Sequence, residues 1–271
     1  MKPGERATGT ARDRPSPGQK AETGVRVGVF SDIHGNLVAL EAVLADLERV
    51  QPDWLVCLGD VAATGPQPRE SVRRLRALGC PVVMGNADAA LLGPSHRNAA
   101  GEGDAARFAE IDAWCAAQLT ADDLGFVRRF AARQTLPLAP GHALLCYHGS
   151  PRSYDDVIVA TTPDEDLDAL LGDAEVTALA GGHTHAPMLR RHGERLVLNP
   201  GSVGLPYEVS RSDGRIRNPP WAEYAVVAWS DAGLQVAFRR VPVEVAAVTR
   251  AALDSGMPHA AWWAGGWTGW Q

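Results

Sequence analysis

The feature that most constrains the fold of this chain is a series of short apolar runs that each end in polar residues of the types that bind metals. The first run, residues 25–29, is followed by Phe-Ser-Asp-Ile-His-Gly-Asn at residues 30–36. A continuous apolar run of this length is typical of a buried parallel strand. Asp32 and His34 would then lie at the carboxyl end of that strand, where open α/β sheets bind their ligands. Alone, the pair also fits a simpler interpretation in which Asp32 caps the following helix.

Two further apolar runs in the first third of the chain end in the same way. The predicted elements of this part are helices over residues 37–50 and 68–78 and strands at residues 54–58 and 81–84. The first of these strands ends in Gly-Asp, with Asp60, and the second in Gly-Asn-Ala-Asp, with Asn86 and Asp88. A strand, a helix and a strand at this spacing predict a right-handed βαβ unit. Gly-Asp and Gly-Asn are also ordinary turn pairs, but three such endings in series fit a turn-only interpretation poorly.

The second half of the chain supplies three histidines in the same setting. Its predicted elements are a loop over residues 89–103, helices over 105–119, 121–133 and 243–253, a further helix that opens at residues 162–165, and strands at 134–138, 142–147, 176–180, 196–198, 224–229 and 234–241. His148 opens His-Gly-Ser-Pro after one strand, and His183 and His185 belong to Gly-Gly-His-Thr-His after another. The candidate metal ligands are therefore Asp32, His34, Asp60, Asn86, His148, His183 and His185. Because each follows a strand, one edge of a sheet could gather all seven.

Length and composition favour one folded domain with two extensions. The chain has 271 residues, enough for a large α/β domain, and no interdomain linker is evident. Residues 1–23 are rich in Gly, Pro, Thr, Arg and Lys and are expected to be a disordered extension, followed by the domain over residues 24–257. The tail, residues 258–271, holds four of the eight tryptophans, which favours packing against the domain or a contact with a partner.

Charge and cysteine usage limit the classes of partner and compartment. A formal net charge of -6 and a pI near 5.7 argue against a general nucleic-acid-binding surface, although a small anionic substrate is compatible with a local positive site. No apolar run is long enough to span a membrane, and the N-terminus lacks the apolar segment of a signal peptide. The widely spaced cysteines favour reduced thiols; they are Cys57, Cys80, Cys115 and Cys146. We therefore expect a cytoplasmic protein, and the sequence leaves a homo-oligomer open.

The candidate ligands have a charge that suits two cations in one pocket. Two divalent ions bring four positive charges, of which Asp32 and Asp60 neutralise two, while the histidines and Asn86 bind as neutral groups. About two positive charges would remain for a hydroxide and a phosphate group. A Ca²⁺ site would need more carboxylates. Mixed imidazole and carboxylate ligands suit Mn²⁺, Fe, Co²⁺, Ni²⁺ or Zn²⁺.

The ordered set of motifs resembles the calcineurin-like metallophosphoesterase superfamily. The motifs are Asp-x-His, Gly-Asp, Gly-Asn, His-Gly and Gly-His-Thr-His, in this order within residues 25–241. The Gly-Asn-x-Asp form, the His-Gly-Ser-Pro stretch and Asn-Pro-Gly-Ser-Val-Gly at residues 199–204 are similar to its small bacterial and archaeal phosphodiesterase branch. The resemblance implies a four-layered αββα sandwich with a dinuclear metal site at the sheet edge.

The resemblance also implies roles for individual residues. A first ion would be bound by Asp32, His34, Asp60 and His185, and a second by Asp60, Asn86, His148 and His183. Asp60 would bridge the ions, and a hydroxide between them would attack phosphorus in line. The expected catalytic residues are Asp60, Asn86 and His183, and the expected supporting residues are Asn36, Asp88 and Thr184. Two divalent ions are the implied cofactors, with Mn²⁺ expected first and Ni²⁺, Fe²⁺ or Fe³⁺, Co²⁺ and Zn²⁺ as alternatives.

One position departs from the family pattern. Many members have a histidine directly after Gly-Asn, where it stabilises the transition state or protonates the leaving group, and this chain has Ala87. The absence favours substrates whose leaving groups depart unaided. His96 is a candidate substitute, although a loop histidine in water fits the sequence as well. Arg152, close after the His148 motif, is a candidate contact for a substrate phosphate.

These observations predict a metal-dependent phosphoesterase that acts on small phosphodiesters. Within the same chemistry, a phosphomonoesterase or a dinucleoside-polyphosphate hydrolase is the alternative. A third possibility is a protein-binding scaffold, because a retromer subunit uses this fold for protein interaction. A scaffold would be expected to have lost metal ligands, and this chain retains all seven.

Overall fold

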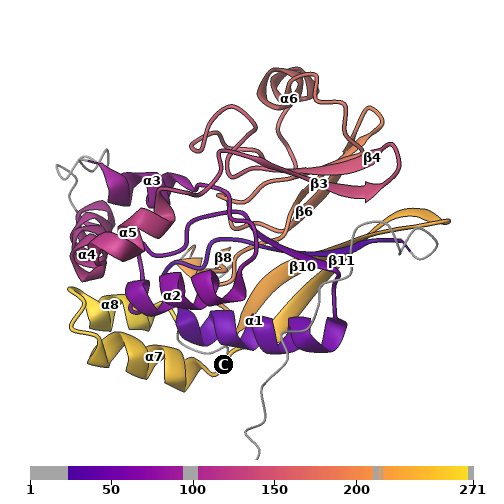
Figure 1. Ribbon diagram of the computed structural model, residues 1–271. Coiled ribbons are helices and arrows are strands. Elements are labelled where there is room, and N and C mark those ends of the chain that lie inside the picture. The colour runs from indigo at the N-terminus through magenta and orange to yellow at the C-terminus, as the bar shows by residue number, and fades with distance from the viewer. Residues whose placement is uncertain (1–23, 94–102, 210–213, 215, 268–271) are drawn as a thin grey trace, which may run out of the picture.

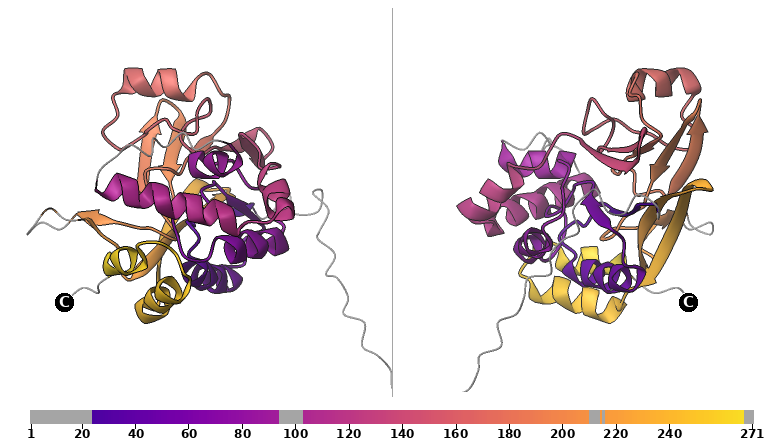
Figure 2. Two further views of the ribbon diagram at one scale, coloured as in Figure 1. Left: turned by 90° about the vertical axis from the view of Figure 1, so that its left-hand side faces the viewer. Right: turned by 45° about the vertical axis from the view of Figure 1, so that its right-hand side comes forward.

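The chain forms two facing β-sheets with helices on their outer faces. Figure 1 shows the computed structural model, which describes residues 24–93, 103–209, 214 and 216–267. The first sheet has the strand order β11-β10-β1-β2 and the second β3-β4-β5-β7-β6. Most helices lie outside the first sheet and α6 lies outside the second, so the layers follow in the order α, β, β, α (Figures 1 and 2). This arrangement confirms the predicted fold class.

The first sheet contains the predicted βαβ unit. Its strands are β1 (Arg26–Phe30), β2 (Trp54–Cys57), β10 (Trp221–Ser230) and β11 (Gly233–Pro242). Strands β1 and β2 are parallel, with Val29 opposite Val56, and β10 pairs with β1 in the antiparallel sense, with Ala225 opposite Val29. Helix α1 (Leu37–Val50) connects β1 to β2. The remaining helices of this half are α2 (Pro68–Leu78), α3 (Asn86–Leu92), α4 (Asp104–Gln118), α5 (Ala121–Val127), α7 (Val245–Asp254) and α8 (Ala260–Gly265).

The second sheet brings three parallel strands to the same edge. Its strands are β3 (Gln134–Ala139), β4 (His142–Cys146), β5 (Ala178–Ala180), β6 (Met188–His192) and β7 (Arg195–Asn199). Strands β4, β5 and β7 are parallel, with Ala180 opposite both Cys146 and Leu198. Helix α6 (Asp164–Leu171) covers the outer face of this sheet. A short ribbon of β8 (Glu208–Val209) and β9 (Ile216–Arg217) follows β7.

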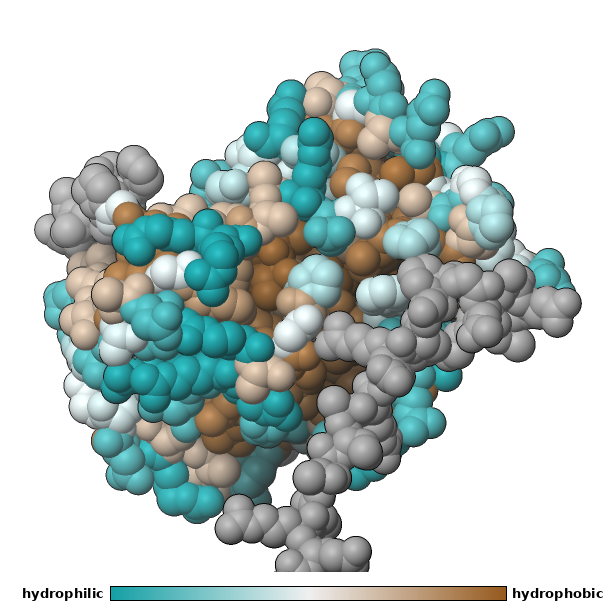
Figure 3. Space-filling view, viewed as in Figure 1, coloured by the Kyte–Doolittle hydropathy of each residue, from teal (hydrophilic) through white to brown (hydrophobic). Residues whose placement is uncertain are grey.

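Three apolar layers hold the sandwich together. The layer between the sheets includes Val27, Val29 and Leu144, while Phe30 faces the helices on the other side of β1. Strand β1 is therefore buried on both faces, which explains its unbroken apolar run. On the face shown in Figure 3, hydrophilic residues cover the outer helices and apolar residues gather between the two lobes. Among the described residues, no helix is both long and apolar enough to cross a membrane.

A polar contact ties α1 to the first sheet on its outer side. Asp46 of α1 accepts hydrogen bonds from the Tyr224 hydroxyl and from Nε of Arg239, both at 2.7 Å. The hydrogen bond from Arg239 lowers the pKa of Asp46 below its usual value. The contact therefore stabilises the fold only where Asp46 is ionised.

Several elements differ from those that the sequence predicted. The predicted strand at residues 81–84 is reduced to two isolated bridges, Val82 with Cys57 and Val83 with Ala131. Residues 86–92, predicted as a turn and loop, form α3, and α5 ends at Val127 rather than at residue 133. The N-terminal extension, residues 1–23, and residues 268–271 lie outside the described residues.

The Trp-rich tail continues the fold. Helix α8 lies beside α7 (Figure 1), and its Trp262 ring contacts Phe108 of α4, with the ring centroids 5.0 Å apart. Trp263 and Trp267 belong to the same apolar core as α1. The described part of the tail, which ends at Trp267, thus packs against the domain, as one of the two sequence-based interpretations expected.

Candidate metal centre

All seven candidate ligands lie at one edge of the sandwich. They follow β1, β2, β4 and β5, except for Asn86, which begins α3. Among the described residues, two groups could each hold a metal ion, because the ligand atoms within each group lie within 4.8 Å of one another. The first cluster is Asp32, His34 and His185. The second cluster is Asp60, His148 and His183, to which Asn86 is adjacent.

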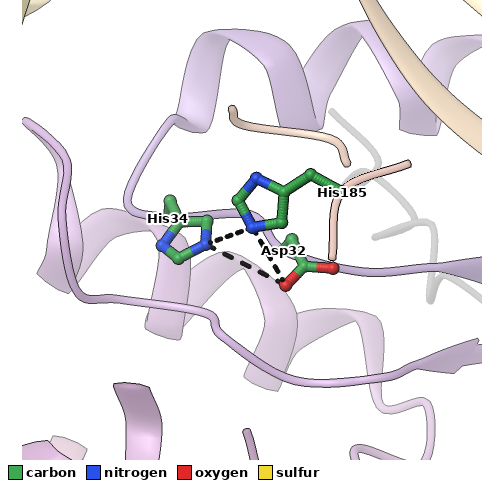
Figure 4. Close-up of side chains that lie close together, drawn as sticks. All are labelled: Asp32, His34 and His185. Carbon is green, nitrogen blue, oxygen red and sulfur yellow. Dashed lines mark hydrogen bonds and ion pairs between the residues drawn. The ribbon is translucent and has the colours of Figure 1, made fainter. Parts of the chain in front are cut away.

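The side chains of the first cluster converge on one point (Figure 4). The Nε2 atoms of His34 and His185 are 3.1 Å apart, and His185 Nε2 lies 3.4 Å from Oδ1 of Asp32. Oδ1 of Asp32 is buried and has no hydrogen-bond partner among the described residues. A buried carboxylate oxygen without a donor is an unfavourable arrangement that a bound cation would resolve.

In both histidines of the first cluster, the hydrogen bond made by Nδ1 determines whether Nε2 can bind a cation. His34 Nδ1 lies 3.1 Å from the carbonyl oxygen of Ala63, and His185 Nδ1 lies 2.8 Å from that of Leu205. A carbonyl oxygen only accepts, so both Nδ1 atoms carry a proton and both Nε2 atoms are free to bind a cation. Two lone pairs facing each other at 3.1 Å repel unless a proton or a metal ion lies between them. The first cluster is therefore built to hold positive charge.

The second cluster has the same construction. His148 Nδ1 donates to the carbonyl oxygen of Leu58 at 2.8 Å, which leaves Nε2 directed at Asn86 Oδ1, 3.0 Å away. Oδ1 of Asn86 also lies 3.1 Å from Nδ1 of His183. Three groups that can bind a metal through lone pairs thus face one another, and their chemistry suits a divalent transition-metal ion.

Asp60 lies between the two clusters. Its Oδ2 atom is 3.4 Å from His148 Nε2 and 3.7 Å from His34 Nε2. The other oxygen, Oδ1, accepts the backbone N–H of Ala87 at 2.8 Å. The hydrogen bond at Oδ1 orients the carboxylate and directs Oδ2 to the space shared by both clusters.

The charges of the site follow from burial and from these short distances. Burial alone would raise the pKa of Asp60. The nearby His148 and His34 lower this pKa by more than burial raises it, so the pKa of Asp60 lies below its usual range. Burial lowers the pKa of His148, but the Asp60 carboxylate outweighs this and raises it to about 10. Burial and the neighbouring His185 lower the pKa of His34 to about 4, while Asp32 raises that of His185. Without a metal, a proton on His148 balances the charge of Asp60, and a metal ion would displace it.

Most of the candidate ligands have an unusual backbone conformation. The left-handed region is occupied by Asp32 (φ 57°), His34 (φ 47°), Asp60 (φ 53°), His183 (φ 68°) and His185 (φ 56°). Residues other than glycine seldom adopt a positive φ, and such strain clusters at functional sites. Neighbouring loops hold this geometry: Asp32 N–H donates to the Gly59 carbonyl oxygen and His34 N–H to that of Asp60.

The residues predicted to support the site make specific contacts. Asp88 accepts the backbone N–H groups of Asp60 and Val61 at 2.8 Å and that of Gly85 at 3.2 Å. Burial and the charge of Asp60 raise the pKa of Asp88 to about 7. Asp88 thus fixes the loop that carries Asp60 to the start of α3.

The two other predicted supporting residues link loops around the first cluster. Asn36 caps α1 by accepting the N–H of Ala39, and its amide donates to the Gly204 carbonyl oxygen. Thr184 Oγ1 accepts a hydrogen bond from the Asn199 amide. The Asn36 contact joins the His34 loop to the segment after β7, and the Thr184 contact joins the His183 loop to the end of β7.

The structure places the remaining candidates in different ways. Ala87 is fully buried and its side chain offers no polar group, while His96 lies outside the described residues. The guanidinium of Arg152 pairs with Asp156, with Nε 3.2 Å from Oδ2, and is largely exposed. Arg152 also lines a cavity of about 480 Å³ beside α6, whose lining includes none of the seven candidate ligands.

Some contacts at the site have no signal in the sequence. The histidine rings are oriented by backbone carbonyl groups of Leu58, Ala63 and Leu205, and any residue type carries such a group. Ser202, in Asn-Pro-Gly-Ser-Val-Gly, donates through Oγ to the Asp32 carbonyl oxygen. Of these contacts, only the one made by Ser202 involves a residue that a sequence motif singles out.

Comparisons with known proteins agree with this geometry. A family model described as the calcineurin-like phosphoesterase superfamily domain matches residues 25–216. An uncharacterized protein of Methanocaldococcus jannaschii is 28% identical over 200 residues, which cover 66% of this chain and 76% of the relative. Phosphodiesterase YfcE of Escherichia coli is 28% identical over 187 residues, covering 65% of this chain and 78% of the relative. The crystal structure of a metallophosphoesterase from Sphaerobacter thermophilus has 30% identity and a TM-score of 0.68, covering 89% of this chain and 99% of that one.

Proposed function

Since this chain belongs to the calcineurin-like phosphoesterase superfamily and is a metal-dependent phosphoester hydrolase, we propose that it hydrolyses phosphodiester bonds with two divalent metal ions. The observation that carries the proposal is the position of Asp60, whose Oδ2 faces His148 of one cluster and His34 of the other. A single carboxylate oxygen shared by two sets of imidazole ligands is the arrangement expected of a bridging ligand.

The residues divide into two sets of ligands around Asp60. Asp32, His34 and His185 would hold the first ion, and Asn86, His148 and His183 the second. When bound, the ions would supply the positive charge that activates a water molecule and stabilises the phosphoryl oxygens. Asp60 would bind both ions and so hold the two sites together, while Asn86 and His183 would position the second ion. The ligand chemistry allows several transition metals, and we propose Mn²⁺ first.

Ala87 favours a diester substrate. The position after Asn86 carries a methyl group, and the Ala87 N–H is already bound to Asp60 Oδ1 at 2.8 Å. The chain thus offers no proton donor at that position, so the leaving group would need to depart as a stable anion. The name of YfcE, a phosphodiesterase, points to the same substrate class.

The substrate class is tested by hydrolysis of matched aryl phosphates. The metal-stripped protein is supplied with Mn²⁺, Ni²⁺, Co²⁺ or Zn²⁺, and release of nitrophenol is followed from a bis-nitrophenyl diester and from the mononitrophenyl ester. We expect metal-stimulated hydrolysis with the diester ahead. A faster monoester would favour a phosphomonoesterase, and turnover of a dinucleoside polyphosphate alone would favour that hydrolase. No metal-stimulated turnover of any of these substrates would reject the proposal.

We propose a small phosphoester substrate rather than a nucleic acid. The overall charge is -6, and positive charge is concentrated where two cations would bind between Asp32 and Asp60. We also propose a cytoplasmic location. It is supported by the four cysteines, which all lie in described ranges and form no disulfide.

A further inference from the structure

The C-terminal helix α8 is connected to the first cluster through the loop after Asp60. Trp263 of α8 is only 5% exposed, and its indole Nε1 donates to the Thr64 carbonyl oxygen at 2.8 Å. The preceding residue, Ala63, provides the carbonyl oxygen that binds Nδ1 of His34. One peptide unit therefore separates the indole contact from the group that orients a candidate metal ligand.

The loop needs this contact because its backbone is strained. Thr64 has φ 74°, which is an outlier for a β-branched residue. Its hydroxyl donates to Asp112 Oδ1 of α4 at 2.8 Å, so the side chain and the carbonyl oxygen of Thr64 are both held. Gly65 follows, and a Cβ there would lie 1.8 Å from the His34 carbonyl oxygen. A loop packed this closely against His34 transmits a small displacement directly to the ligand.

A second connection runs from α8 to the other histidine of the first cluster. Asn218 donates its backbone N–H to the Gly266 carbonyl oxygen at 2.8 Å, directly after α8. The Asn218 amide in turn donates to the Pro206 carbonyl oxygen at 2.8 Å. The residue before Pro206 is Leu205, whose carbonyl oxygen binds Nδ1 of His185 at 2.8 Å. Both histidines of the first cluster are therefore anchored one residue away from a contact that leads to the C-terminal segment.

The second cluster is anchored elsewhere. His148 Nδ1 donates to Leu58, directly after β2, and Gly182 N–H binds the His148 carbonyl oxygen. Asp60 is held by Asp88 of α3. These anchors belong to the sheets and to α3, and none of them involves α8.

We propose that the C-terminal segment positions the first metal ion, with Trp263 and Asn218 as positioning residues for His34 and His185. The inference rests on the proposed two-metal centre. It gives the Trp-rich tail a role in metal affinity in addition to packing.

The test replaces Trp263 by Phe, which removes the indole N–H and keeps an aromatic ring in the core. We expect the affinity of one of two Mn²⁺ sites to fall about three- to ten-fold, since a neutral hydrogen bond is typically worth up to about a factor of ten. The other site should keep its affinity. Binding is measured by equilibrium dialysis and titration calorimetry on the metal-stripped full chain, and circular dichroism confirms folding.

The matched control is Trp267→Phe. Trp267 lies in the same core, with its ring centroid 6.2 Å from that of Trp263, and its buried Nε1 has no partner within the described part of the chain. The same substitution there should leave both Mn²⁺ affinities unchanged. Equal losses in the two variants would overturn the proposal, because they would show a general effect of core packing.

Ligand variants assign the effect to one site. In a His185→Ala background, where the first site is already lost, Trp263→Phe should not weaken the remaining site; in a His148→Ala background its effect should persist. Asn218→Ala tests the second connection if Trp263→Phe fails to fold, and it should also weaken only the first site.

A wild-type chain that binds no Mn²⁺ would reject the two-metal centre itself. A wild type that binds two ions, with variants that bind both equally well, would reject the role of α8 alone.

Discussion

Replacing Asp60 by Asn is the sharpest test of the shared site. The amide keeps the shape of the carboxylate, and its oxygen can still accept the Ala87 N–H that now binds Oδ1 at 2.8 Å. The negative charge at Oδ2 is lost, 3.4 Å from His148 Nε2 and 3.7 Å from His34 Nε2. If Asp60 is a common ligand, both metal ions should bind more weakly, and hydrolysis should fall with them.

The distances give the size of the effect. A unit positive charge 3.4 Å from the carboxylate oxygen interacts with it by about 5 kcal/mol at an effective dielectric constant of about 20. If rearrangement of the site and water recovers half of this, about 2.5 kcal/mol is lost per unit charge. That is roughly a 60-fold decrease in affinity for each ion, and a divalent ion should lose more.

The assay is Mn²⁺ binding to the metal-stripped protein, measured by titration calorimetry, with hydrolysis of an aryl diester at saturating Mn²⁺ as a second measurement. The control is Asp46→Asn, which removes a carboxylate that contacts Arg239 and Tyr224 rather than the metal ligands. It should leave both affinities unchanged. Loss of only one ion from Asp60→Asn would assign the residue to a single site, and two affinities within ten-fold of wild type would refute the electrostatic reasoning.

Three further predictions follow from the same contacts. Metal binding should release protons, and the metal affinity should increase between roughly pH 6 and 8. The reason is that burial lowers the pKa of His148 but Asp60 raises it to about 10, so a bound ion must displace a proton from this ring. Calorimetry in buffers of different ionisation enthalpy counts the released protons, and an affinity independent of pH would contradict the prediction. Gly85→Ala should abolish binding at both sites, since a Cβ there would lie 2.1 Å from Asp60 Oδ1, whereas Gly93→Ala, with open space at the other end of α3, should bind normally. Asp46→Asn should lower the free energy of unfolding by about 2 kcal/mol at pH 7. The folded pKa of Asp46 is lowered, so its contribution is present above its unfolded value of 3.8 and is lost as the pH falls through the folded pKa; denaturant unfolding at pH 7 and pH 3 should show the difference between variant and wild type shrinking.

The positions of the candidate ligands could be predicted because they follow apolar runs. Strand β1 is buried on both faces, so its sequence is apolar throughout, and Asp32 and His34 stand out directly after it. The same contrast marks Asp60, His148 and His183. Parallel strands have their carboxyl ends at one edge, so the fold class was enough to bring these residues together.

The partners within each cluster could not be derived in the same way. His34 faces His185, 151 residues away, and the linear sequence gives no reason to prefer it to His183. The expected grouping came from the family resemblance. The pairing is set by the backbone of the Gly-His-Thr-His loop, where both histidines have positive φ and their side chains therefore point to different clusters.

The elements that the sequence missed are those that depend on tertiary contacts. Helix α8 has only six residues, too few for a stable isolated helix, and it is stabilised by burial of Trp263 and of the following Trp267 in the core. Helix α3 begins at Asn86, within a motif that was interpreted as a turn. Asp88 accepts the Gly85 N–H at its start, a capping contact that the spacing of these residues allows but does not require.

The strained backbone of the ligands explains why the site needs so much support from its surroundings. A left-handed conformation costs a residue other than glycine roughly 1–2 kcal/mol, so the five ligands that adopt it cost on the order of 5–10 kcal/mol together. This is comparable to the whole stability of a typical domain. Close packing and backbone hydrogen bonds such as those from Asp32 to Gly59 and from His34 to Asp60 must offset it in the metal-free protein. Metal binding to the folded state adds to that support by mass action, so the unfolding temperature should rise with Mn²⁺ concentration, and it should rise less in Asp60→Asn. An unfolding temperature that did not respond to Mn²⁺ would show that the strained loops are held by the fold for a reason other than metal binding.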